Sequence, residues 1–202
     1  MDFLAFAAQC GPDVHPVTTT ALVKAESGFR PLAVRNNTTK QSFYPTTDEE
    51  ARQLVDGFAA KGDRLAIGLM QVTTPWTVRF NIRPADLLDA CTNVRVGTAI
   101  LRANYDACRK PGRAEQGTLE CALSAYWSGN GEIGGAYVNH VYSVAGSVLR
   151  VPETPGVTDG VLHSKNSGKS SSKGAVPRFD AVPTSSEAVG FTPQTRDGFS
   201  FR

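Results

Sequence analysis

Glu26 is the side chain in this sequence best suited to act as a general acid. It lies in the last turn of a helix predicted over residues 15–25 and ending near Gly28, with Pro16 at the first helical position. The negative end of the helix dipole disfavours a carboxylate there, and burial in an apolar cleft would raise the pKa of Glu26 further. Taken alone, a solvated surface glutamate is the simpler interpretation. The assignment of Glu26 therefore depends on the other motifs.

Three further motifs follow Glu26 along the chain in a particular order. They are Gly68-Leu69-Met70-Gln71, Ala125-Tyr126-Trp127-Ser128-Gly129-Asn130, and Tyr137. Gln71 offers a donor and an acceptor to an acetamido or hydroxyl group, although an ordinary buried amide is the alternative. Aromatic residues in helices are more often core than ligand-binding, so we expect Tyr126 in the core. Trp127 stays open between the core and sugar stacking.

Together with Glu26-Ser27-Gly28-Phe29, these ordered motifs resemble those of the lytic transglycosylases of the goose-type lysozyme superfamily. The most similar members accompany type IV secretion and conjugation machines, and the resemblance covers roughly residues 8–149. It implies a mainly α, lysozyme-like single catalytic domain with a substrate cleft. It also implies Glu26 as the catalytic residue and a substrate-binding set of Ser27, Gly68, Leu69, Met70, Gln71, Ala125, Tyr126, Ser128, Gly129, Asn130 and Tyr137. The family usually has Asn in place of Trp127, which puts subsite detail in doubt rather than catalysis.

The resemblance also implies a reaction. The substrate would be the glycan strand of peptidoglycan, whose MurNAc-GlcNAc β-1,4 bond is cleaved with formation of 1,6-anhydro-MurNAc ends and without a cofactor. Glycosidases ordinarily use two carboxylates, but this sequence offers no obvious second one. The candidates lie in or beside one predicted helix and are adequately explained as solvated residues: Asp48, Glu49, Glu50 and Asp63. In the family the substrate itself takes the second role, so one carboxyl serves as acid and then as base. A hydrolase that uses water, and a wall-binding assembly protein without turnover, stay open as alternatives.

Apolar residues at three- and four-residue spacing predict further helices that position these motifs. One begins at a capping box of Thr47 and Glu50 and ends before Gly62. The others cover residues 92–108, 119–128 and 137–149. No alternating strand is evident between them, and residues 36–46 are left unassigned as a possible short hairpin.

The four cysteines contain no CxxC pair, and the three histidines lie far from them in sequence, so zinc-ligand spacing is absent. Spacing alone leaves two disulfides and four free thiols equally open. If bridges form, Cys91 cannot pair with Cys108, because the helix between them separates them by about 25 Å at ~1.5 Å per residue. Of the two remaining connectivities we predict Cys108 with Cys121, across a short loop between antiparallel helices, and Cys10 with Cys91.

Other function classes find little support. Gly129, Gly131 and Gly134 match a GxGxxG pattern, but a predicted helix precedes them where a dinucleotide site needs a strand. The formal charge of +2 does not call for a nucleic-acid partner. No apolar run approaches the ~20 residues that span a bilayer, so stable membrane insertion is not expected.

The two ends of the chain differ in character from its middle. The apolar residues 3–8 are either the end of a clipped leader or a first helix, and we favour an export signal upstream of this sequence and a periplasmic location. Residues 1–150 are predicted to be the lysozyme-like domain. Residues 151–202 are rich in Pro, Gly, Ser and Lys and are predicted to be a disordered tail, dispensable for cleavage, that contacts type IV secretion components.

Overall fold

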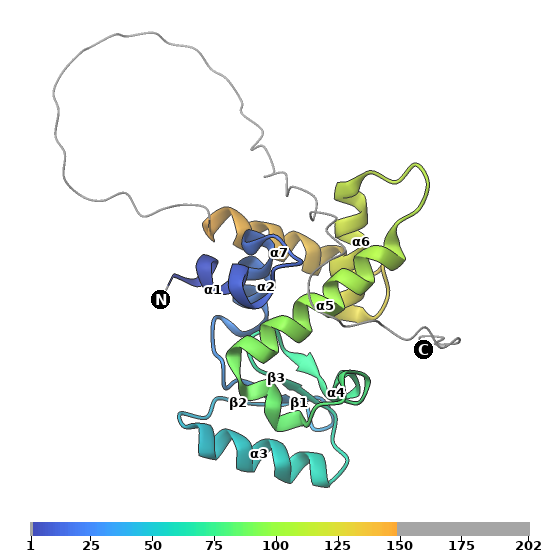
Figure 1. Ribbon diagram of the computed structural model, residues 1–202. Coiled ribbons are helices and arrows are strands. Elements are labelled where there is room, and N and C mark those ends of the chain that lie inside the picture. The colour runs from blue at the N-terminus through green and yellow to red at the C-terminus, as the bar shows by residue number, and fades with distance from the viewer. Residues whose placement is uncertain (1, 149–202) are drawn as a thin grey trace, which may run out of the picture.

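The computed structural model describes residues 2–148, which fold into two lobes joined by one long helix (Figure 1). That helix, α5 (Ala90–Cys108), runs from one lobe into the other. The helical lobe contains α1 (Phe3–Cys10), α2 (Pro16–Ser27), α6 (Glu115–Ser128) and α7 (Gly135–Val148). The sheet lobe contains a small sheet with α3 (Asp48–Ala60), α4 (Thr74–Phe80) and the 3-10 helix η1 (Pro84–Leu88). The predicted mainly helical class is confirmed.

Local capping signals explain where the first long helices begin and end. At the start of α2, Nδ1 of His15 accepts a hydrogen bond from the Val17 amide at 3.3 Å. The helix ends at Gly28, whose φ of 59° is a left-handed conformation that favours glycine. Thr47 caps α3 by accepting a hydrogen bond from the Glu50 amide at 3.2 Å. These boundaries agree with those predicted from the sequence.

The later helices begin earlier than predicted. α5 begins at Ala90, α6 at Glu115 and α7 at Gly135, ahead of the predicted residues 92, 119 and 137. α4 and η1 had no counterpart in the prediction. Both are short, so neither contains enough turns for an apolar period to be visible.

Four very short strands form the sheet, in the order β2-β1-β3-β4 with antiparallel neighbours. They are β1 (Val34–Asn36), β2 (Gln41–Phe43), β3 (Leu65–Ile67) and β4 (Val72–Thr73). A strand of two or three residues is too short to display an alternating pattern, which is why the sequence did not reveal the sheet. The unassigned residues 36–46 do contain the turn between β1 and β2.

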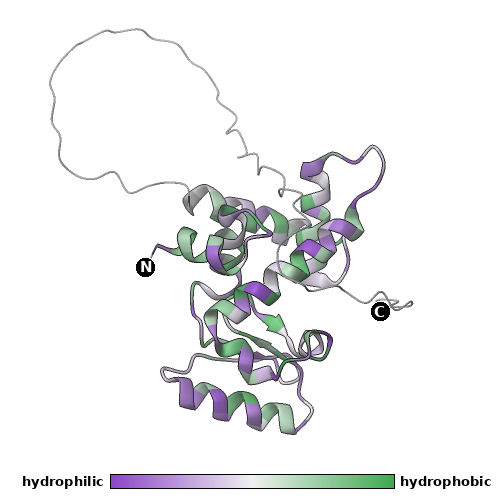
Figure 2. Cartoon of the chain, in the orientation of Figure 1, coloured by the Kyte–Doolittle hydropathy of each residue, from purple (hydrophilic) through white to green (hydrophobic). Residues whose placement is uncertain are grey.

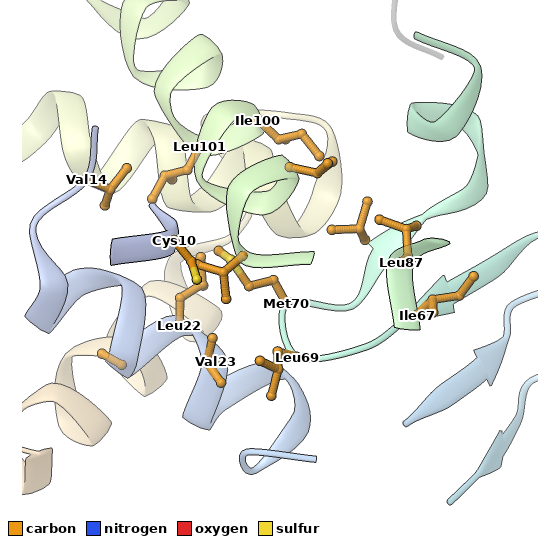
Figure 3. Packing of buried hydrophobic residues seen from close by; sticks show 14 of the residues in the cluster. Cys10, Val14, Leu22, Val23, Ile67, Leu69, Met70, Leu87, Ile100 and Leu101 are labelled. Carbon is orange, nitrogen blue, oxygen red and sulfur yellow. The ribbon is translucent and has the colours of Figure 1, made fainter. Parts of the chain in front are cut away.

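One continuous apolar core spans both lobes. Figure 3 shows Leu22 and Val23 of α2 next to Leu69 and Met70, with Leu101 and Ile100 of α5 nearby. Met70 is fully buried and reaches α5 where Gly97 leaves room, since a Cβ on Gly97 would lie 2.8 Å from Cβ of Met70. The residues just before Gln71 therefore pack into the centre of the protein.

Helix α3 covers the outer side of the sheet lobe. Figure 2 shows hydrophilic and hydrophobic residues alternating along it, and its buried residues are Ala51 and Val55. The acidic residues of its first turn, Asp48, Glu49 and Glu50, are exposed. Negative side chains at a helix N-terminus are stabilised by the helix dipole, so these carboxylates have a structural explanation.

Both predicted disulfides are present. Cys10 at the end of α1 is bonded to Cys91 in the first turn of α5, with Cα atoms 5.1 Å apart. Cys108 at the end of α5 is bonded to Cys121 of α6, with Cα atoms 6.0 Å apart. Residues 3–8 accordingly belong to a helix that is bonded into the folded lobe.

The predicted tail, residues 151–202, lies outside the described residues. Among residues 2–148, no helix is both long and apolar enough to cross a bilayer.

Candidate active site

Glu26 lies where α2 meets α7. It occupies the last turn of α2, just before the left-handed Gly28, and α2 packs against α7. Its side chain is partly buried, and Oε1 accepts a short hydrogen bond from the hydroxyl of Tyr137 on α7. Two predicted site residues, distant in sequence, are therefore in direct contact.

Burial controls the acidity of Glu26. Removal of the carboxyl from water raises its pKa from 4.5 to about 7, and the hydrogen bond from Tyr137 opposes the rise only in part. Among residues 2–148, no second carboxylate contributes to this shift. A group with a pKa near neutrality is able both to donate a proton and to accept one at neutral pH.

The two tyrosines near Glu26 stay protonated. Burial and the negative charge of Glu26 raise the pKa of both Tyr137 and Tyr126 well above the usual value. Tyr137 therefore acts as a hydrogen-bond donor to the carboxyl rather than as a base. The hydroxyl of Tyr126 donates to the carbonyl of Met70 at 2.8 Å, so Tyr126 joins α6 to the second motif.

The second motif, Gly68 to Gln71, forms a tight turn between β3 and β4, which we call the GLMQ turn. Gly68 has φ of 77° and Gln71 has φ of 47°, both in the left-handed region. A Cβ on Gly68 would lie 2.7 Å from the carbonyl oxygen of Leu87, so only glycine fits. The close approach to η1 sets the path of this turn.

Asn93, which the sequence analysis did not single out, holds the GLMQ turn in place. It is fully buried in the first turns of α5. Its Nδ2 donates to the carbonyls of Ile67 and Leu87, both at 2.8 Å, and its Oδ1 accepts from the Met70 amide at 2.8 Å. A signal was available, because Asn93 is four residues before Gly97 and so lies on the same face of the helix predicted over residues 92–108.

Gln71 is oriented by backbone carbonyls. Its Nε2 donates to the carbonyl of Gly68 at 2.9 Å and to that of Ala33 at 3.2 Å. None of the hydrogen bonds among the described residues uses its Oε1. The side chain is partly buried and fixed by these two hydrogen bonds, and its Oε1 is available as an acceptor for a ligand.

The third motif shapes the connection between α6 and α7. Gly129 ends α6 with φ of 75°. The Ser128 hydroxyl lies 2.7 Å from the Ser124 carbonyl and 2.8 Å from the Asn130 carbonyl, and it accepts from the Asn130 amide at 3.0 Å. These contacts fix the loop that leads into α7, and so they determine where Tyr137 lies.

Trp127 belongs to the surface of the site, not to the core. Its side chain is 58 % exposed, although it stands in the last turn of α6. Its ring stacks on that of Tyr137 with centroids 5.9 Å apart and an interplanar angle of 15°. Of the two possibilities left open for Trp127, core or ligand contact, the core is therefore excluded, and Trp127 is an exposed aromatic residue beside Tyr137.

Several predicted site residues have buried side chains. The Ser27 hydroxyl donates to the Val23 carbonyl at 3.2 Å within α2, and the side chains of Leu69 and Met70 are 3 % and 0 % exposed. Ala125 is partly buried, and its carbonyl accepts from the Gly129 amide at 2.8 Å. These residues therefore support the site from behind.

Two of the other acidic residues considered from the sequence accept hydrogen bonds elsewhere. Oδ2 of Asp63 accepts from Nδ2 of Asn36 at 2.8 Å, and Oε2 of Glu50 accepts from the Thr46 amide at 3.1 Å. Across residues 2–148, no cluster of three His, Cys, Asp or Glu side chains is arranged to hold a metal ion.

Comparison with known proteins shows the family to which this chain is similar. Residues 3–143 match the family described as "Transglycosylase SLT domain". "Type IV secretion system protein virB1" of Brucella abortus (strain 9-941) is 35% identical over 130 residues, 63% of this chain and 54% of the relative. "Protein virB1" of Agrobacterium fabrum is 34% identical over 146 residues, 71% of this chain and 59% of the relative. The matched part thus spans little more than half the length of these relatives, and no solved structure matches significantly.

Proposed function

The chain belongs to the transglycosylase SLT domain family, and we propose on that basis that it is a peptidoglycan lytic transglycosylase. It cleaves the MurNAc-GlcNAc β-1,4 bond of glycan strands and leaves 1,6-anhydro-MurNAc ends. The observation that carries the proposal is Glu26, a partly buried carboxyl with a pKa of about 7 and no second carboxylate contributing to that shift among the described residues.

Glu26 serves twice in the proposed reaction. Its protonated form first delivers a proton to the glycosidic oxygen as the bond from that oxygen to C1 of MurNAc breaks, while the N-acetyl group of the sugar assists at C1. The 6-hydroxyl of the same MurNAc then forms a bond to C1, and its proton passes to the carboxylate of Glu26. A pKa near neutrality suits both steps, because neither form of the group is rare at neutral pH.

The neighbours of Glu26 have distinct proposed roles. Tyr137 orients the carboxyl through its hydrogen bond. Gln71 offers Oε1 to a hydroxyl or acetamido group. Gly68, Leu69, Met70 and Ala125 hold the wall behind Gln71 in place through backbone hydrogen bonds and packing. Ser27, Tyr126, Ser128, Gly129 and Asn130 keep these groups in place through the contacts described above.

The names of the relatives suggest a setting. The Brucella relative is called a type IV secretion system protein, and we propose that this chain acts in the periplasm, opening the wall locally for such an apparatus. Residues 1–150 form the catalytic unit in this proposal, and residues 151–202 contact components of the apparatus.

Mass analysis of the products from purified peptidoglycan tests the proposed reaction. We expect muropeptides with anhydro ends, each lighter by one water than its hydrolysed counterpart. Products with free reducing ends would instead identify a hydrolase. Binding to the strands with no product at all, by protein whose disulfides are intact, would identify a wall-binding protein and end the proposal.

A further inference from the structure

A groove of about 330 Å³ lies next to the carboxyl end of α2. It is lined by residues 29–33, which follow Glu26 almost directly, and by Tyr44 and Pro45 after β2. Its volume is at the lower end of the range found for small-ligand sites. Most of the lining is apolar, with Arg30 as its charged member. No role for this groove follows from the reaction proposed above.

Arg30 presents an uncompensated positive charge at this groove. Its guanidinium lies over the ring of Tyr44, 5.0 Å from the centroid. Arg30 is exposed, and among residues 2–148 it takes part in neither of the two ion pairs. Stacking on an aromatic ring holds the planar guanidinium flat while its N–H groups stay available at the edges, the arrangement that favours bidentate binding of a carboxylate.

The groove is connected to the candidate active site through its wall. The carbonyl of Ala33, a lining residue, accepts a hydrogen bond from the Gly68 amide at 2.8 Å and one from Nε2 of Gln71 at 3.2 Å. At the other side, the ring of Phe29 is held against Phe3 of α1 with centroids 4.9 Å apart. The groove and the GLMQ turn therefore share a wall at Ala33, close to the carboxyl end of α2.

We propose that the groove binds the short peptide attached to the glycan, with Arg30 holding one of the peptide's carboxylates. This inference rests on the proposed function, because it takes the substrate to be peptidoglycan. Peptidoglycan peptides combine small apolar residues with free carboxylates, which fits an apolar groove with a single cation at its side. The groove would thus make the protein prefer strands that still have their peptides.

Binding to two forms of soluble glycan strand tests this inference. One form has its peptides, and the other has been stripped by an amidase, which leaves each lactyl carboxyl in place. The Glu26→Gln protein is used so that neither strand is consumed. We expect it to bind the peptide-bearing strands about three- to fivefold more tightly, the size of effect that an exposed ion pair produces.

Charge variants identify the residue responsible. Adding Arg30→Gln should abolish the preference, whereas Arg30→Lys should keep part of it. Arg35→Gln is the matched control, because Arg35 is an exposed cation on the neighbouring strand β1 and does not line the groove. We expect it to leave the preference unchanged.

Other outcomes overturn the inference. One is that the Glu26→Gln protein binds both forms of strand equally, or binds neither. Another is that Arg30→Gln weakens the binding of both forms by the same factor, or that Arg35→Gln reduces the preference as much as Arg30→Gln does. The product analysis of the wild-type protein is a separate readout. Anhydro products without a strand preference would refute only the groove, and a strand preference without anhydro products would refute only the proposed reaction.

Discussion

Two regions of the molecule meet at the site and hold their polar groups by different means. Where α2 meets α7, Glu26 is withdrawn from water, and within the described part of the chain its side chain has one hydrogen-bond partner, Tyr137. In the GLMQ turn there is no titratable group, and Asn93 makes three hydrogen bonds of 2.8 Å that fix the backbone. The first arrangement produces reactivity through desolvation, and the second produces shape through satisfied polar groups. Changes in the first region should therefore alter the rate and the pH dependence of rate and stability, and changes in the second should mainly reduce stability.

The largest effect on rate is expected from Glu26→Gln. Glutamine keeps the shape but has no acidic proton, so turnover of glycan strands should fall by at least about 100- to 10,000-fold with the fold intact. Chromatographic quantification of released muropeptides measures it. Amide variants of Asp48, Glu49, Glu50 and Asp63, made singly, are the controls and should stay active. One of them proving as damaging as Glu26→Gln would favour a mechanism with two carboxylates.

The same variant should be more stable than the wild type above neutral pH. Because burial raises the pKa of Glu26 from 4.5 to about 7, the folded protein binds an extra proton between these values, and its stability falls as pH rises across them. The loss in the wild type's free energy of unfolding reaches about 3 kcal/mol above pH 7. It is absent below pH 4.5, where Glu26 is protonated in both the folded and the unfolded protein. Urea unfolding of both proteins at pH 4 and pH 8 measures the difference. If the Glu26→Gln protein were more stable than the wild type by the same amount at pH 4 and pH 8, the raised pKa of Glu26 would be contradicted.

Asn93→Ala should be the most destabilising of these changes. It leaves the Met70 amide and the carbonyls of Ile67 and Leu87 without their buried partner, at a cost of about 3 kcal/mol. Urea unfolding measures this cost, and Asn139→Ala, an exposed position on α7, is the control. A loss of turnover with unchanged stability would mean that Asn93 contacts the substrate rather than the turn.

Tyr137→Phe should shift the pH dependence of cleavage. The Tyr137 hydroxyl lowers the pKa of Glu26, so its removal raises that pKa above about 7 and moves the alkaline fall in turnover to higher pH. The maximal rate should drop by about tenfold, as expected for loss of a hydrogen bond to a charged group. Rate profiles from pH 5 to pH 9 measure both changes. Tyr142→Phe on the same helix should shift neither, because the Tyr142 hydroxyl accepts a hydrogen bond from Gln116 at 2.6 Å.

The smallest effect is expected from Trp127→Ala. Loss of an exposed ring that stacks on Tyr137 should raise the KM for glycan strands by about two- to tenfold, in line with aromatic pair energies. The pH profile should stay in place, because Trp127 makes no contact with Glu26 among those described. Trp127→Phe should restore most of the affinity. A shifted pH profile would show instead that Trp127 positions Tyr137.

The amino-acid sequence determined the features that arise from residues close together in the chain. The end of α2 at Gly28 and the cap of α3 at Thr47 follow from single residues and their immediate neighbours. The pairing of Cys108 with Cys121 followed from a short loop between two helices. The order of the motifs was also visible, because each is a contiguous run of residues.

Only the tertiary structure decided what these motifs do for one another. The pKa of Glu26 depends on burial and on a tyrosine 111 positions away, and no local pattern encodes either. Tyr126 was expected in the core, yet its hydroxyl ties α6 to the GLMQ turn. The spacing of Asn93 from Gly97 could have indicated that it is buried, but its function depends on three backbone groups from two other segments. Desolvation and hydrogen-bond satisfaction are properties of the packed chain, so the reactivity of Glu26 is decided when α2 and α7 pack together.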